Sequence, residues 1–175
     1  MLHYDMGKLK LIITLFFLLF IQRSSFAQME QMQAAYIYNF ATMTSYPASM
    51  QTGNFLIVVI GNTNVFPALE AIAKTKKIGT QAITVKRIAS SAEIGNAHMV
   101  FVSDDMKSKF ADVVSNTASS HTVVITESPG LAKKGAIFNF VIIDSKLKFE
   151  VNESKANAKG VKLSVNLIKL GIPVQ

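Results

Sequence analysis

The chain contains no cysteine, and it has only four prolines among 175 residues and 17 % charged residues. Without cysteine there is no disulfide framework, so the fold has to be stabilised by an apolar core. Half of the residues are hydrophobic, and a chain of this length can build one such core in a single domain. The composition therefore predicts one domain without covalent cross-links.

No hydrophobic run reaches the roughly 20 residues that a membrane-spanning helix requires. The longest, Leu11–Ile21, has eleven residues, and it follows a basic start. Small side chains at Ser25 and Ala27 suit cleavage by a signal peptidase before Gln28. We therefore expect residues 1–27 to be a cleaved signal peptide and the rest of the chain to be exported to the periplasm. A retained membrane anchor is the less favoured alternative.

Basic residues outnumber acidic ones by 18 to 11, which gives a formal net charge of +7. Loss of Lys8, Lys10, Arg23 and Asp5 with the signal peptide would leave a net charge of +5. The remaining lysines are spread along the chain, which is typical of a solvated surface. No basic and aromatic cluster is present, so nucleic acid is not an expected partner. Attraction to anionic lipid or to an acidic partner stays open.

The sequence contains none of the motifs that are typical of common enzyme classes. There is no G-x-G-x-x-G, no G-x-x-x-x-G-K-[ST] and no G-x-S-x-G. His98 and His121 begin separate apolar runs, so neither a metal site nor a histidine-activated nucleophile is expected. We expect a protein that acts by binding, with no catalytic residues and no cofactor. A degenerate dinucleotide fold and an unrecognised hydrolase are the weaker alternatives.

Short apolar runs alternate with amphipathic segments through the middle of the chain. This alternation favours a largely parallel sheet with helices packed on its faces. Strands are predicted over 55–60, 81–88, 99–102 and 121–126, and helices over 30–46, 67–75, 90–95 and 105–116, the last capped by Ser103 and Asp104.

The pattern changes after residue 135. Two strand-like runs, 136–143 and 146–152, are separated by Asp144 and Ser145, a spacing that suits a two-residue hairpin. One face of that hairpin is predicted to be apolar, with Phe138 opposite Val151, Phe140 opposite Phe149 and Ile142 opposite Leu147. Two short helices are predicted beyond it, one from Asn152 to Gly160 and one over 164–170.

The predicted fold class is therefore α/β. We expect a single domain over residues 28–175, built on a mixed, mostly parallel sheet that is flanked by helices and ends in a C-terminal antiparallel hairpin.

Polar side chains follow the predicted strands at their carboxyl ends. Ligands of open parallel sheets bind at that edge, where helix N-termini offer hydrogen-bond donors. The candidate ligand-binding residues at this edge are Asn62, Thr63, Asp104 and Glu127. The alternative is that they only cap helices and turn the chain.

Aromatic residues crowd the first predicted helix, which has more rings than one packing face can use. Most of them are expected in the core. If Tyr36, Tyr38 and Met43 are left partly outside, they are candidate partner-binding residues, because interfaces favour such amphipathic apolar patches.

Asn139, Glu150 and Asn152 form a second candidate partner-binding group, on the face of the hairpin opposite its apolar side. Their structural alternative is a cross-strand hydrogen bond between Asn139 and Glu150, with Asn152 as a helix cap. In the functional alternative, Glu150 receives a cationic group of a partner.

These two regions carry a family resemblance. The run A-A-Y-I-Y-N-F over 34–40 with Tyr46 and Pro47, together with F-N-F over 138–140 and F-E-V-N over 149–152, resembles the YfiR family of small periplasmic proteins. The resemblance covers roughly residues 31 to 171. It implies a mixed α/β domain, often dimeric, that regulates rather than catalyses.

Members of that family resemble inhibitors that bind the periplasmic sensor part of an inner-membrane diguanylate cyclase. They thereby restrain cyclic-di-GMP production and biofilm matrix, and in the best-known system an OmpA-like outer-membrane lipoprotein relieves the restraint. Redox control through cysteines cannot transfer to this chain. The usual Asp-Gly hairpin turn is Asp144-Ser145 here, which disfavours a tight turn with positive φ.

Two hypotheses therefore remain open at this point. The first is a periplasmic regulator that holds a membrane sensor, a cyclase or a histidine kinase, in its inactive state. The second is a periplasmic small-molecule-binding protein that uses the crevice between loops 61–64 and 126–130.

Overall fold

The computed structural model describes residues 28–174. The predicted signal peptide lies outside the described residues. Within them, no helix has the length and apolar character needed to cross a bilayer.

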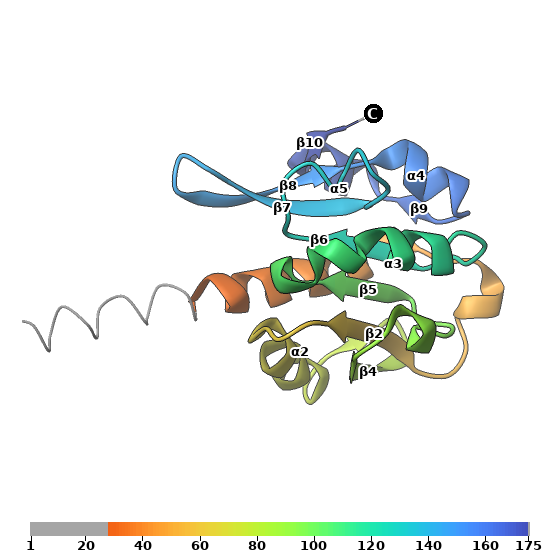
Figure 1. The fold of residues 1–175 in the computed structure, drawn as a ribbon. Helices are drawn as coiled ribbons and strands as arrows, with labels where there is room; N and C mark the ends of the chain where they lie inside the picture. Colours follow the sequence, from red (N-terminus) through yellow and green to blue (C-terminus); the bar gives the residue numbers. More distant parts are fainter. Residues whose placement is uncertain (1–27, 175) are drawn as a thin grey trace, which may run out of the picture.

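An eight-stranded sheet forms the centre of the molecule, in the order β10-β8-β7-β6-β5-β2-β4-β3 (Figure 1). The five strands from β7 to β4 run parallel, and only the edges contain antiparallel pairs and a short terminal strand. The strands are β2 (Phe55–Ile60), β3 (Lys77–Ile78), β4 (Gln81–Ile88), β5 (Met99–Val102), β6 (Val123–Thr126), β7 (Phe138–Ile143), β8 (Lys146–Val151) and β10 (Ile172–Pro173). The predicted α/β class with a mostly parallel sheet and a C-terminal hairpin is confirmed.

Helices cover both faces of this sheet (Figure 1). One face carries the N-terminal helix, residues 28–42, with α2 (Val65–Ala73), α4 (Glu153–Ala158) and α5 (Val165–Leu170). The other carries α3 (Phe110–Asn116) and the 3₁₀ turns η2 (Ser91–Glu93) and η3 (Asp104–Lys109). A further 3₁₀ turn, η1 (Ala48–Met50), and a small two-stranded sheet of β1 (Thr44–Ser45) and β9 (Lys162–Leu163) complete the domain.

Strands β2 and β5 are apolar at every position because both faces of the central sheet are covered. Ile57 and Val59 face the layer of the N-terminal helix, where Phe40 is fully buried. Val58 belongs to the opposite core, which Phe110 of α3 closes. The continuous hydrophobic runs in the sequence follow from this three-layer arrangement.

The N-terminal helix ends earlier than the predicted 30–46. Its last helical residue is 42, because Thr44 and Ser45 pair as strand β1 with Leu163 and Lys162. The predicted capping by Ser103 is also wrong. The hydroxyl of Ser103 instead donates to the carbonyl oxygen of Ile60 at 3.1 Å, and η3 begins without a side-chain cap.

The predicted hairpin register is confirmed. Phe138 pairs with Val151, Phe140 with Phe149 and Ile142 with Leu147. One member of the apolar face departs from the prediction, since Ile142 is 55 % exposed. Strand β7 extends beyond the end of β6, which pairs only with Phe138 and Asn139. The tip of the hairpin therefore projects from the body of the domain (Figure 1).

The turn of this hairpin also departs from expectation. Asp144 and Ser145 have φ values of 52° and 58°. The chain thus makes a tight turn with two positive φ values, although Ser145 stands where glycine is preferred. The strand pairing on both sides therefore outweighs the conformational cost at Ser145.

Candidate functional site

Asn139 and Glu150 meet across the hairpin as the sequence predicts. The Nδ2 of Asn139 donates to the Oε2 of Glu150 at 2.7 Å. Asn139 is fully buried, whereas Glu150 is only partly buried. The Oδ1 of Asn139 has no hydrogen-bond partner, so the pair fixes one carboxylate oxygen and leaves a buried acceptor unsatisfied.

Asn152 has the structural role predicted as one of its alternatives. Its Oδ1 accepts hydrogen bonds from the backbone of Lys155 at 3.0 Å and from Ser154, which caps α4. Its Nδ2 donates to the carbonyl oxygen of Ala132 at 3.2 Å. These hydrogen bonds position the base of the hairpin. Because Asn152 is 3 % exposed, its side chain is not part of the molecular surface.

The candidate residues on the N-terminal helix and in the turn after it are half-buried. Tyr36, Tyr38 and Met43 all pack against the core. The ring of Tyr36 lies 5.7 Å from that of Phe149 and 6.0 Å from that of Phe140, measured between centroids. Tyr36 therefore covers the apolar face of the hairpin.

Tyr36 and the Asn139–Glu150 pair lie on opposite faces of the hairpin. Side chains alternate along a strand, and Tyr36 packs on the face of Phe140 whereas Asn139 and Glu150 belong to the other. They do not form one continuous patch. The exposed tip, with Ile142 and Ile143, is the element that links the two faces.

The strand-end residues gather as expected, but mostly bond to one another. The backbone N–H of Asp104 donates to Glu127 at 3.1 Å, and Ser128 donates to the Asp104 carboxylate at 2.8 Å. The Ser128 and Lys107 hydrogen bonds lower the pKa of Asp104. Thr63 is buried, and its hydroxyl accepts from the backbone of Val65.

Asn62 completes the group of predicted ligand-binding residues. Its backbone N–H donates to the Asp105 carboxylate at 3.0 Å. The pKa of Asp105 is lowered by its hydrogen bonds with Ser103 and with Asn62. Asn62, Thr63 and Asp104 take part in hydrogen bonds within and between the loops, and none of them lines the groove that Glu127 lines.

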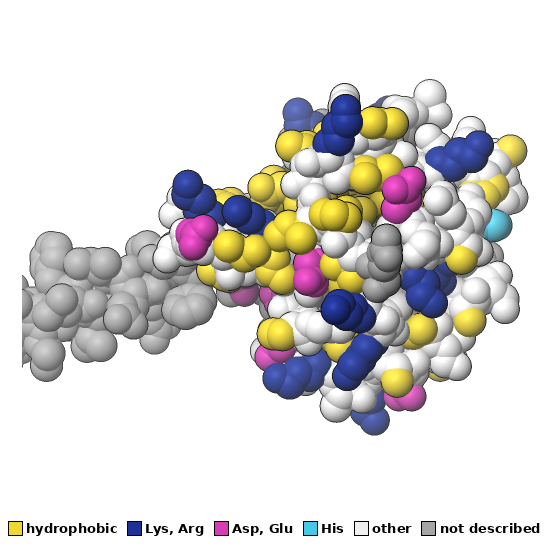
Figure 2. All heavy atoms as spheres, turned by 90° about the horizontal axis from the view of Figure 1, so that it is seen from above, with side chains coloured by type: hydrophobic (Ala, Val, Ile, Leu, Met, Phe, Trp, Pro, Cys, Tyr) yellow, Lys and Arg dark blue, Asp and Glu magenta, His cyan; other side chains and the backbone are white. Residues whose placement is uncertain are grey.

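A groove of about 590 Å³ lies at this edge, but in a different place from the predicted crevice. Its walls are the N-terminal helix, the start of the loop after β6, and the inner side of the projecting hairpin. Glu127 is the one predicted ligand-binding residue that lines it. Figure 2 shows hydrophobic side chains gathered over the projecting hairpin, with charged side chains at its tip.

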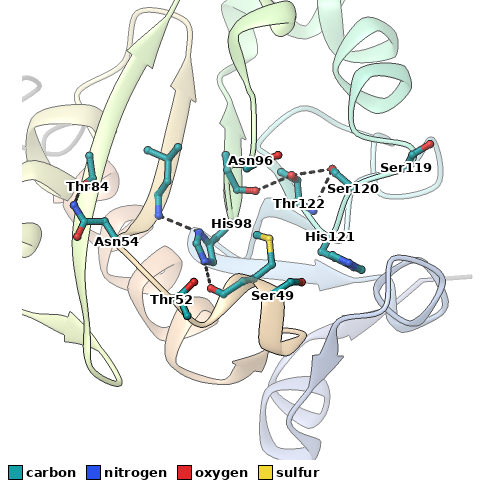
Figure 3. Close-up of a pocket in the computed structure, with 13 residues that line it drawn as sticks. Ser49, Thr52, Asn54, Thr84, Asn96, His98, Ser119, Ser120, His121 and Thr122 are labelled. Carbon is teal, nitrogen blue, oxygen red and sulfur yellow. Dashed lines mark hydrogen bonds between the residues drawn. The ribbon is translucent and has the colours of Figure 1, made fainter.

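A second, more polar hollow of about 650 Å³ lies at the opposite edge, where the strands begin (Figure 3). Its lining is rich in side-chain hydroxyls and amides, and it includes both His98 and His121. The sequence does not predict this hollow, because its lining residues come from the ends of loops that are far apart in the chain.

His98 has no free ring nitrogen in this hollow. Its Nδ1 accepts the backbone N–H of Leu56 at 3.1 Å, so Nε2 carries the proton and donates to the carbonyl oxygen of Met50 at 2.7 Å (Figure 3). Burial lowers the pKa of His98. His98 thus fastens the loop before β2 to the start of β5. Within residues 28–174, no three His, Asp or Glu side chains gather as a metal site would need.

Comparison with known families decides the assignment. A sequence model described as YfiR/HmsC-like matches residues 30–172. The chain belongs to the YfiR/HmsC-like family. The resemblance seen in the aromatic helix and the paired hairpin motifs is thereby confirmed. No curated protein matches the chain significantly.

Proposed function

We propose that this YfiR/HmsC-like protein is a periplasmic regulator that binds the periplasmic domain of an inner-membrane diguanylate cyclase and restrains cyclic-di-GMP synthesis. The observation that carries the proposal is the family match over residues 30–172. The proposal assigns binding and no catalysis to the protein. Its consequence in the cell is less biofilm matrix.

The mechanism is a population shift. A regulator that binds the inactive conformation of a sensor more tightly than the active one lowers the active fraction by that difference in affinity. An OmpA-like outer-membrane lipoprotein that competes for the regulator would release the cyclase. A homodimer of the regulator would present two copies of its binding surface to a dimeric sensor.

The surface proposed for the contact is the hairpin tip. Ile142 is 55 % exposed and Ile143 is 37 % exposed, and together they place two aliphatic side chains in solvent. An isolated pair of this kind on a projecting element fits the centre of an interface. Glu150, which Asn139 orients, supplies a carboxylate for a cationic group of the partner.

Photo-crosslinking in living cells tests the contact. A photoreactive amino acid at Ile142 is expected to capture a membrane protein with a cytoplasmic cyclase domain. The matched control is Val165, which is 65 % exposed and belongs to α5 and not to the hairpin. Capture of the same protein with equal yield from both positions, or of no cyclase from Ile142, contradicts the proposal.

A further inference from the structure

The groove beneath the hairpin has a chemistry that the regulator proposal does not use. Among the described residues only two charged side chains line it, Glu30 and Glu127, and both are acidic. No lysine or arginine of residues 28–174 lies within salt-bridge distance of either carboxylate. This concentration of negative charge stands in a protein whose net charge is positive.

Both carboxylates are held in place by neighbouring donors. Glu30 accepts hydrogen bonds from the backbone and the side chain of Asn64, at 3.2 and 2.8 Å. Glu127 accepts the backbone N–H of Asp104 at 3.1 Å and the Nε2 of Gln33 at 2.6 Å. Each anion is therefore oriented before any ligand arrives, which reduces the entropy lost on binding.

Gln33 gives a second and independent indication of a ligand. It lines the groove, the residue is 4 % exposed, and its Oε1 has no hydrogen-bond partner among residues 28–174. A buried acceptor without a donor is rare in folded proteins, because it has lost its hydrogen bonds to water. A ligand that brings a donor to this wall would satisfy an acceptor that the protein leaves open.

The rest of the groove is apolar. Phe140, Ile142 and Leu147 of the hairpin face Met29 and Pro129 across it. A volume of about 590 Å³ is within the range of small-molecule sites, which combine an apolar lining with a few convergent polar groups. Here both charged side chains of the lining are carboxylates, which disfavours an anion as the natural occupant.

We propose that this groove binds a small organic cation. Its ammonium group contacts Glu30, Glu127 and Gln33, and its apolar body packs against the hairpin. Charge complementarity fixes the sign of the ligand. The multiple N–H donors of an ammonium match the two carboxylates and the open amide oxygen.

The test uses three probes with one phenylbutyl body and different head groups. 4-Phenylbutylamine is cationic, 4-phenylbutanol is neutral and 5-phenylvalerate is anionic at pH 7. Calorimetric titration of the processed protein is expected to give a Kd for the amine at least tenfold lower than for the alcohol or the acid. The methyl signals of Ile142 and Leu147 are expected to shift in NMR spectra as the amine is added.

Substitutions separate the charged contacts from the apolar ones. Glu30→Gln and Glu127→Gln are each expected to weaken amine binding about tenfold and to change alcohol binding less than twofold. Gln33→Met is expected to weaken amine binding as well. The control is Glu70→Gln on the exposed side of α2, away from the groove, which is expected to change neither. Thermal melts of each variant show that it is folded.

Equal affinity for the three probes, tighter binding of the acid, or no binding at millimolar amine overturns the proposal. Amine binding that is unchanged in both Glu30→Gln and Glu127→Gln overturns it too. These measurements use the regulator alone, so their failure leaves the proposed contact with a cyclase standing.

Discussion

Asn139 donates to Glu150 across the hairpin at 2.7 Å, while its own side-chain oxygen stays buried without a partner. The pair orients a half-exposed carboxylate from a fully buried amide. The amide at position 139 therefore sets the orientation of the Glu150 carboxylate.

Asn139→Asp is expected to lower the free energy of unfolding by about 3 kcal/mol at pH 7, because it buries a second carboxylate against Glu150. The repulsion raises the folded-state pKa of the new Asp above its unfolded value. The folded state then binds more protons, so the deficit shrinks as the pH falls towards 4 and grows as the pH rises. Urea denaturation at pH 4 and pH 7 measures it.

The double variant Asn139→Asp with Glu150→Gln is the control, because the amide then donates in the opposite direction. It is expected to recover most of the stability at pH 7. A loss that is equal in the single and the double variant, or independent of pH, contradicts the account of this pair.

The sequence was sufficient to predict the hairpin register. A two-residue spacer leaves one pairing, and it gathers Phe138, Phe140, Phe149 and Val151 on the buried face. It was not sufficient to predict that Ile142 is exposed, since that depends on where the neighbouring strand β6 stops. Periodicity reports which side a residue faces and not whether anything covers that side.

The groove was beyond sequence reasoning for a related reason. Gln33 and Glu127 are 94 positions apart in the chain, and nothing local marks either as a ligand. Only the packing of the N-terminal helix beside the loop after β6 brings them together. The groove lies at the predicted strand-end edge, but of the four residues predicted there only Glu127 lines it.

Ser145→Gly is expected to raise the free energy of unfolding by about 1 kcal/mol, because glycine adopts the positive φ of 58° without steric cost. Ser145→Thr is expected to lower it, since a β-branched side chain tolerates this conformation poorly. Denaturant titration compares the two variants. The same sign of change in both would contradict the turn geometry.

Acidification is expected to weaken the anchor at His98. Burial holds its folded-state pKa below the ordinary value near 6.5, so the unfolded chain binds a proton more readily than the folded one. The stability that this provides is present above pH 6.5 and is lost as the pH falls below that value. Unfolding experiments between pH 7.5 and 5 follow the loss.

His98→Asn retains one acceptor and one donor without the titration. It is expected to flatten that part of the pH profile. A slope equal to that of the unmodified protein would assign the pH dependence to other groups.

Ile142→Asp is expected to change the free energy of unfolding by less than about 0.5 kcal/mol, because the side chain is more than half exposed. Phe149→Ala, at a position 3 % exposed, is expected to cost about 3–4 kcal/mol through the cavity it leaves. Thermal or urea denaturation compares them. Similar losses would show that the tip is packed and not free for a partner.

The regulatory account is tested most directly by the cellular cyclic-di-GMP concentration in a strain that lacks this protein. The account predicts a rise on deletion, restored to the original level by the unmodified gene and by Val165→Asp but not by Ile142→Asp. A concentration unchanged by deletion, or restored equally by both variants, would contradict it.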